Sequence, residues 1–304
     1  MTKDKRNARK LKDGASYNGS MCALGAHGLS STLSAPKKPH QPKTEETRSP
    51  PFFYLAWYTK TMPYRKTKFA NDEIYHIVTR RISDKPLFID TDDYYRGIFS
   101  IYEFNNVKPV EIQKRRRARV FEKKKLAQSG GDRVSATDKR EKLVEILAFT
   151  LMPNHLHLLI RQLKNDGITK LMNKFGAGYP AYFRQKHKIQ EKGYFFQGRF
   201  VSVHIKSDNQ LLTVFTYIHA NPLSLTEPGW KKGKVKNLRK AIEFLENYKW
   251  SSYQDYLGKK NFSSVTDRNF LLETVGGRKK VREIVNDWIK HKKTIKGENE
   301  IFLE

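Results

Sequence analysis

Short apolar stretches separated by turn-forming residues mark the strands that this sequence predicts. Residues 144–151 and 156–160 are apolar and rich in branched side chains, and a proline-asparagine pair at 153–154 separates them. This pattern predicts two neighbouring strands joined by a turn. An alternating stretch at 73–82 predicts an earlier strand, and 195–205 predicts a later one.

Helical patterns accompany these strands. Residues 91–104 and 168–189 place apolar side chains at helical spacing. A third helix begins at Ser207, because Gln210 three residues later completes a capping-box pattern. The order strand, helix, strand, strand, helix, strand predicts an α+β fold with a ferredoxin-like (RRM-like) antiparallel sheet and helices on one face. We expect the other face to stay open and a helical extension to follow at the C-terminus.

Two histidines stand one residue apart on the second of the paired strands. Side chains at i and i+2 of a strand share a face about 6 to 7 Å apart, so His155 and His157 can close on one metal ion. Leu156 and Leu158 then point the other way, into a core. From spacing alone, the commoner structural uses of histidine remain open. His76, on the first strand, is interpreted as a structural or DNA-facing residue and not as a ligand.

A tyrosine and an asparagine lie four residues apart on the helix that Ser207 opens. Thr213, Tyr217 and Asn221 fall on one face of it, away from the centre of the apolar stripe. Pro222 ends the helix and disfavours helical dihedral angles in the residue before it, so Asn221 is expected at a frayed end. There its amide oxygen could turn toward a metal ion.

Four motifs in this order resemble those of one enzyme family. Residues 152–160 resemble the His-hydrophobic-His motif of the HUH single-tyrosine transposases (IS200-like transposases), and 217–222 resembles their helix with the nucleophilic tyrosine. Within that family the likeness is to the REP-associated tyrosine transposases. Residues 196–200 resemble their Trp-Gln-x-Arg-Phe segment, with a phenylalanine in place of the tryptophan, and 250–253 resembles their Trp-Ser-Ser-Tyr motif. The resemblance covers residues 71–257.

The resemblance implies a DNA strand transferase that cleaves single-stranded, hairpin-containing DNA. Tyr217 would be the nucleophile, forming a 5′-phosphotyrosine and releasing a 3′-hydroxyl. His155, His157 and Asn221 would hold Mg²⁺ or Mn²⁺, with Gln197 in a supporting role. Because an unactivated tyrosine has a pKa of about 10, the metal would do most of the work by neutralising the scissile phosphate. Two other interpretations stay open: a non-catalytic nucleic-acid-binding protein with a ferredoxin-like fold, and a relaxase or replication initiator with the same chemistry.

Charge and composition narrow the class of partner. The chain has 304 residues and a net charge of +28 at pH 7, far more than solubility requires, so we expect a polyanion such as DNA. Cys22 is the only cysteine, which excludes an internal disulfide framework and a cysteine-based zinc module. No apolar run approaches the length of a membrane span. We therefore expect a cytoplasmic protein, nucleoid-associated in a prokaryote, that acts as a monomer or homodimer without a small-molecule cofactor.

The pattern divides the chain into four parts. Residues 1–50 predict a disordered basic tail, 51–70 an aromatic and basic linker or arm, 71–222 the catalytic domain and 223–304 the helical extension. A dense basic insertion at 111–140 interrupts the catalytic domain, and phosphate binding explains it at least as well as a solvated face does. The residues expected to bind nucleic acid are basic side chains of the insertion and of the segments after it: Lys114, Arg115, Arg116, Arg117, Arg119, Arg161, Lys170, Lys174 and Arg199.

Overall fold

The computed structural model describes residues 68–112, 114–115, 117–118, 120–121, 124, 140–190 and 193–291. All of them lie in the larger of two compact units, Tyr64–Glu304. The predicted tail at 1–50, most of the arm at 51–70 and part of the insertion, including Arg116 and Arg119, lie outside the described residues. In the part of the chain that the structure describes, no helix is long and apolar enough to cross a membrane.

A four-stranded antiparallel sheet forms the centre of the fold. Its strands are β1 (Ile74–Arg80), β2 (Val144–Met152), β3 (His155–Gln162) and β4 (Val201–His204), in the order β2-β3-β1-β4. The predicted α+β class and ferredoxin-like sheet are confirmed. The last strand is shorter than the predicted 195–205. Its first part contributes one isolated bridge, between Phe196 and Arg81 just after β1, and Gly198, with φ of 101°, lies between this bridge and β4.

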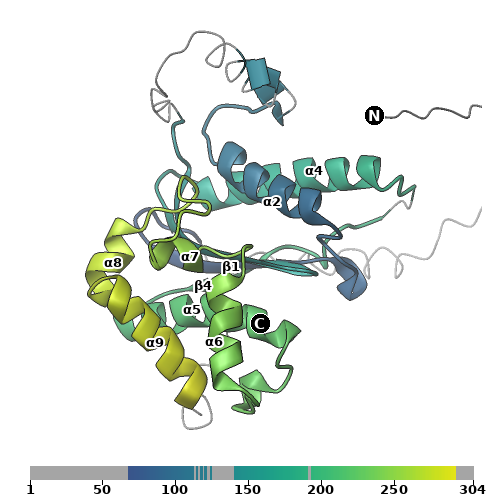
Figure 1. The fold of residues 1–304 in the computed structure, drawn as a ribbon. Coiled ribbons are helices and arrows are strands. Elements are labelled where there is room, and N and C mark those ends of the chain that lie inside the picture. The colour runs from purple at the N-terminus through teal and green to yellow at the C-terminus, as the bar shows by residue number, and fades with distance from the viewer. Residues whose placement is uncertain are drawn as a thin grey trace, which may run out of the picture. The chain divides into compact units, whose positions relative to one another are not determined.

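Two helices cover one face of the sheet (Figure 1). They are α2 (Thr91–Phe104) and α4 (Gly167–Lys186), and Leu156 and Leu158 of β3 pack with them in one buried core. The N-terminus of α2 is capped by Asp90, whose side chain accepts a hydrogen bond from a backbone N–H of the first turn. A short 3-10 helix, η1 (Ile82–Asp84), follows β1. The helices predicted for this region are therefore present in the expected order.

The second face of the sheet is covered as well, so the expectation that it stays open is wrong. The tyrosine helix α5 (Asp208–Ala220) packs its apolar stripe against Leu147 and Leu159 of the sheet. Figure 1 shows α6 (Leu238–Asn247) and α9 (Arg278–His291) on the same side as α5. Because α5 carries apolar side chains toward both the sheet and α9, burying them removes this face from water. The remaining elements are η2 (Asn221–Leu225), η3 (Trp230–Lys232), α7 (Tyr253–Tyr256) and α8 (Asn269–Val275).

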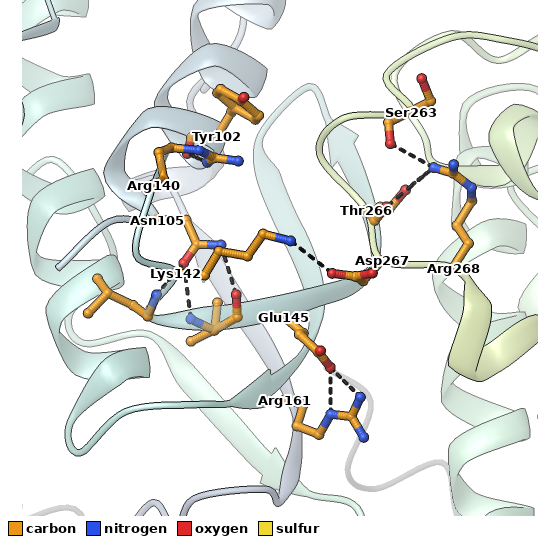
Figure 2. Close-up of polar contacts among 12 residues, drawn as sticks. Tyr102, Asn105, Arg140, Lys142, Glu145, Arg161, Ser263, Thr266, Asp267 and Arg268 are labelled. Atoms are coloured by element: carbon orange, nitrogen blue, oxygen red, sulfur yellow. Dashed lines mark hydrogen bonds and ion pairs between the residues drawn. The ribbon is translucent and has the colours of Figure 1, made fainter. Parts of the chain in front are cut away.

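The end of α2, before the basic insertion, and the start of β2, after it, lie next to each other (Figure 2). Asn105, just after α2, accepts hydrogen bonds from the backbone of Leu143 and Val144 and donates one to the carbonyl of Val144. Nearby, Lys142 forms an ion pair of 2.9 Å with Asp267, in the segment before α8. These contacts fix the end of α2 and the start of β2 to each other and to the C-terminal region.

Candidate active site

The two histidines of β3 lie on the sheet face that α5 covers. Their side chains alternate with Leu156 and Leu158, which are buried in the core on the other face. His155 is 8% exposed and His157 is 1% exposed, and their ring centroids lie 4.8 Å apart. The two imidazoles are therefore neighbours on one face, with His155 at the more open end.

Asn154, in the turn before β3, fixes the orientation of the His155 ring. Its amide nitrogen donates to Oδ1 of Asp84 at 3.3 Å, and because a carboxylate only accepts, the amide oxygen faces the histidine. That oxygen lies 2.6 Å from His155 Nδ1, which must then carry the proton and donate it. In this tautomer Nε2 carries the lone pair, as a metal ligand requires.

His157 is held between a second histidine and an amide. Its Nδ1 lies 2.9 Å from Nε2 of His76 on the adjacent strand β1, and its Nε2 lies 2.7 Å from Nδ2 of Asn221. With the Asn221 amide donating to Nε2, the proton resides on Nδ1 and is donated to His76. His157 then has its lone pair on Nε2, as His155 does. His76 is itself fully buried, and its Nδ1 has no hydrogen-bond partner among the described residues.

Burial keeps the three histidines neutral. It lowers the pKa of His155 to about 3, with further lowering by the charges of Arg80 and Lys231, and it lowers the pKa of His76 to about 4. The pKa of His157 lies well below its usual value, first because of burial and then because of its histidine neighbours. A neutral imidazole keeps the lone pair that binds a metal, and near pH 7 no proton competes for it.

Tyr217 projects from α5 toward these histidines. Its ring centroid lies 5.7 Å from that of His157 and 6.4 Å from that of His76, both nearly edge to face. Trp230 of η3 has its ring centroid 6.2 Å from the tyrosine ring, and Lys231 Nζ lies 5.7 Å from the tyrosine ring centre. The tyrosine is 2% exposed. A phenol, neutral imidazoles and a lysine side chain are therefore gathered in one buried region.

Asn221 lies one helical turn beyond Tyr217, but it is not at a frayed helix end, so that prediction is wrong. Its dihedral angles, φ −54° and ψ −37°, are helical, and its backbone N–H donates to the carbonyl of Tyr217. Pro222 continues the chain into the 3-10 helix η2. The residue is 1% exposed, and its burial against His157 outweighs the steric preference of a residue that precedes proline. Its amide is thereby fixed beside His157 Nε2.

The donor set at this position fits a divalent metal ion. Both histidines of β3 offer Nε2, and rotation of the Asn221 amide would bring its oxygen to the point that its nitrogen occupies. The described residues also contain a separate group with ligand atoms within 4.8 Å of one another: Asp90, Asp93 and His187. That group lies where α2 begins and α4 ends, and Lys186 forms ion pairs with both carboxylates. These pairs link the two helices, on the face of the sheet away from Tyr217.

The residues predicted to bind nucleic acid lie in two settings. Arg161 forms an ion pair with Glu145 (Figure 2), and its guanidinium lies 4.7 Å from the ring centre of Phe270. Lys174 donates to the backbone carbonyls of residues 106 and 108. Both cations are thus engaged within the fold. The other predicted nucleic-acid-binding residues that the structure describes are exposed: Lys114, Arg115, Arg117, Lys170 and Arg199. Gln197 is exposed as well. Their contact with nucleic acid stays a prediction.

Three residues lie at this site although the sequence analysis did not assign them to it: His76, Arg80 and Lys231. His76 contacts His157 directly, and the other two place positive charge near His155. The contribution of His76 depends on the register of β1 against β3, in which Val78 lies opposite His157. The sequence contains the histidine but does not give this register, and nothing in the sequence distinguishes Lys231 from the lysines near it.

Comparison with known proteins identifies the region that carries His155, His157, Tyr217 and Asn221. Residues 105–221 match the profile of a family described as "Transposase IS200 like". The chain carries an IS200-like transposase domain. The predicted resemblance is thereby confirmed, and the match begins after β1, so that His76 precedes it.

This chain was also compared with solved structures, and a similar structure was found. It is described as a REP-associated tyrosine transposase bound to a REP hairpin, with 14% sequence identity, coverage of 69% of this chain and 96% of that chain, and a TM-score of 0.37. The hairpin is the ligand of that protein. Comparison with curated proteins gave no match.

Proposed function

We propose that this transposase domain cleaves and rejoins single-stranded DNA through a covalent 5′-phosphotyrosine at Tyr217. The observation that supports the proposal most is the placement of Tyr217 and Asn221, one helical turn apart on α5, against His157 of β3. A protein that only binds nucleic acid does not require a phenol beside two neutral imidazoles and an amide. The substrate that we propose, in keeping with the family resemblance, is a single strand that contains a hairpin.

In the proposed reaction the oxygen of Tyr217 attacks the phosphorus of the scissile phosphate. The bond to the 3′ oxygen breaks as the bond to tyrosine forms, so the 5′ phosphate stays attached to the protein. The phenol proton passes to solvent, and the departing 3′ oxygen takes up a proton from water. The 3′-hydroxyl can later attack the phosphotyrosine and reverse the step.

The side chains around Tyr217 would position the scissile phosphate and offset its negative charge. The histidine pair of β3 and Asn221 would hold Mg²⁺ or Mn²⁺, which when bound would neutralise charge on the phosphate oxygens. Lys231 would add positive charge next to the phenol, since its Nζ lies 5.7 Å from the ring centre. Asn154 and His76 engage the two Nδ1 atoms of the pair, so Nε2 of each ring is the metal-binding nitrogen.

The burial of Tyr217 sets a condition on this mechanism. Because 2% of the residue is exposed, a DNA strand would reach the phenol only after side chains around it are displaced, and Trp230 and Lys231 lie next to its ring. The same burial favours one alternative function, a ferredoxin-like protein that holds nucleic acid without cutting it.

A covalent-adduct assay separates the two functions. The protein, incubated with Mn²⁺ and a labelled single strand that contains a hairpin, should give an adduct that resists denaturation. Tyr217→Phe should abolish the adduct while the strand still binds. Tyr194→Phe is the matched control, because Tyr194 is 83% exposed, and it should keep the adduct. Persistence of the adduct in Tyr217→Phe would refute the assignment, and binding without any adduct in the wild type would favour the binding protein.

A further inference from the structure

We propose that a cleft on the α4 side of the sheet binds an unpaired nucleotide of the DNA strand on which Tyr217 acts, an inference that rests on the proposed function. The cleft has a volume of about 1020 Å³ and lies between α4, the residues before β1 and the segment before β4. Four of the five residues of the 196–200 motif line it. Only Gln197 of this motif has a proposed role at the site around Tyr217, so the cleft gives the other four residues a role.

Aromatic rings form part of the wall of the cleft. The rings of Phe69 and Phe200 stack with centroids 6.2 Å apart and planes 11° from parallel. Phe196 lies against Phe175, with ring centroids also 6.2 Å apart. Phe69, Phe196 and Phe200 are all partly exposed. Partly exposed rings in a cleft offer faces on which a nucleobase stacks, and this contact tolerates any base.

The charged and polar side chains of the cleft suit a nucleotide. Lys68 and Arg199 are exposed at the cleft, where they can meet a phosphate. Thr169 and Asn173 of α4 offer a hydroxyl and an amide to the edge of a base. Asp166, just before α4, is the one carboxylate among the described residues that line the cleft. Two cations against one carboxylate favour an anionic ligand.

The cleft and the histidine pair lie back to back across β1. Thr79 lines the cleft, whereas the next residue, Arg80, places its charge near His155 on the opposite face. Beside β1, the edge strand β4 is four residues long. A single strand can pass round this short edge, with one nucleotide in the cleft and the scissile phosphate beside Tyr217. A duplex, with a persistence length of about 150 base pairs, is too stiff for such a turn.

Gly176 offers a way to fill the cleft without removing a contact. It lies on α4 among the lining residues, and a Cβ built there meets no atom within 4 Å. Gly176→Leu should therefore place an aliphatic side chain in the cleft, while the helix is retained because leucine forms helices better than glycine does. Ala181→Leu is the matched control, because Ala181 is exposed on the same helix and does not line the cleft.

The probe is a short strand of thymidines with one 5-iododeoxyuridine, bound in the presence of chelator so that cleavage does not occur. Gly176→Leu should lower the affinity for this strand about tenfold, as expected for the loss of one stacked base. Ala181→Leu should bind as the wild type does. Ultraviolet cross-linking of the wild type should attach the iodouracil to the peptide that contains residues 196–200. Arg199→Gln should reduce the slope of log affinity against log salt by about 0.7, the value for one phosphate contact on a single strand.

Several results would overturn the proposal. Equal affinities of Gly176→Leu and Ala181→Leu, or a cross-link confined to other peptides, would show that no base occupies the cleft. Equal competition by inorganic phosphate and thymidine monophosphate would reveal a phosphate site without a base. The adduct assay in Mn²⁺ separates this inference from the proposed function. A cross-link at 196–200 without a Tyr217 adduct would support binding in the cleft and refute cleavage. An adduct without that cross-link would support cleavage and refute binding in the cleft.

Discussion

Replacing His76 with leucine tests whether its hydrogen bond with His157 supports the proposed binding of a metal ion by the histidine pair. The change removes the group that holds Nδ1 of His157, a contact of 2.9 Å between two buried side chains. Leucine is close to histidine in volume, so the substitution deletes the hydrogen bond without opening a large cavity. Every proposed metal ligand is kept. The measured quantity is therefore the contribution of one supporting contact.

The expected loss follows from the nitrogen that is left without a partner. A buried donor that loses its acceptor costs about 1–3 kcal/mol, which corresponds to roughly 5- to 150-fold in an equilibrium constant. His157 can avoid part of this penalty by moving its proton to Nε2, but that nitrogen is then unable to bind metal. Loss of a partner behind a metal-binding histidine typically lowers metal affinity about 10- to 100-fold. We expect a decrease of this size for Mn²⁺ in His76→Leu.

Mn²⁺ binding is measured in the absence of DNA, by electron paramagnetic resonance of the unbound ion. His76→Gln is the companion variant, because its side-chain amide can accept the hydrogen bond from His157, and it should recover part of the lost affinity. At saturating Mn²⁺, His76→Leu should still form the adduct at Tyr217. Thermal unfolding in chelator shows whether each variant is folded.

Two outcomes would contradict the reasoning. Unchanged Mn²⁺ affinity in a folded His76→Leu protein would mean that metal binding does not depend on the orientation of His157. Equal losses in His76→Leu and His76→Gln, together with a lower unfolding midpoint in chelator, would mean that His76 supports the fold and not the ligand.

Stability, packing and salt dependence give three more predictions. Because burial lowers the folded-state pKa of His155 and His219 to about 3, the unfolded chain takes up protons first, and in chelator the free energy of unfolding should fall as the pH drops below about 6.5; a flat profile in urea denaturation would contradict this. Gly167→Ala should cost about 1–3 kcal/mol in the same assay, because a Cβ there would lie 2.3 Å from the carbonyl oxygen of Leu143; unchanged stability would refute the contact. Changing the four arginines of 115–119 to serine should weaken all DNA ligands about equally and reduce the salt slope by up to about 3–4, at about 0.7–0.9 per phosphate; a loss of hairpin discrimination with an unchanged slope would show that the insertion reads the target.

The strands and helices of the sheet domain could be predicted because each has a pattern that is complete within its own segment. The alternation of His155 and His157 with the leucines between and after them is one such pattern, and the structure places the leucines in a core. The apolar stripe of α5 was equally visible, but a stripe does not say what it packs against. The sequence therefore could not predict that the second face of the sheet is covered, because this depends on contacts between α5, α9 and distant strands.

The residues of the candidate site likewise fall into those that the sequence could predict and those that depend on tertiary contacts. The histidine pair, Tyr217 and Asn221 could be named from motifs, whereas His76 enters only through the pairing of β1 with β3. The conformation of Asn221 was predicted wrongly because the rule for a residue before proline is a local preference. In this fold the residue is 1% exposed and held against His157, and these tertiary contacts prevail.

The helix that carries Tyr217 is packed on both sides, with Leu211, Phe215 and Ile218 buried between the sheet and the C-terminal helices. A DNA end joined to this tyrosine would thus have a fixed position relative to the sheet, because such a helix cannot swing outward without exposing its core. Rejoining would then require the second DNA end to travel to the first.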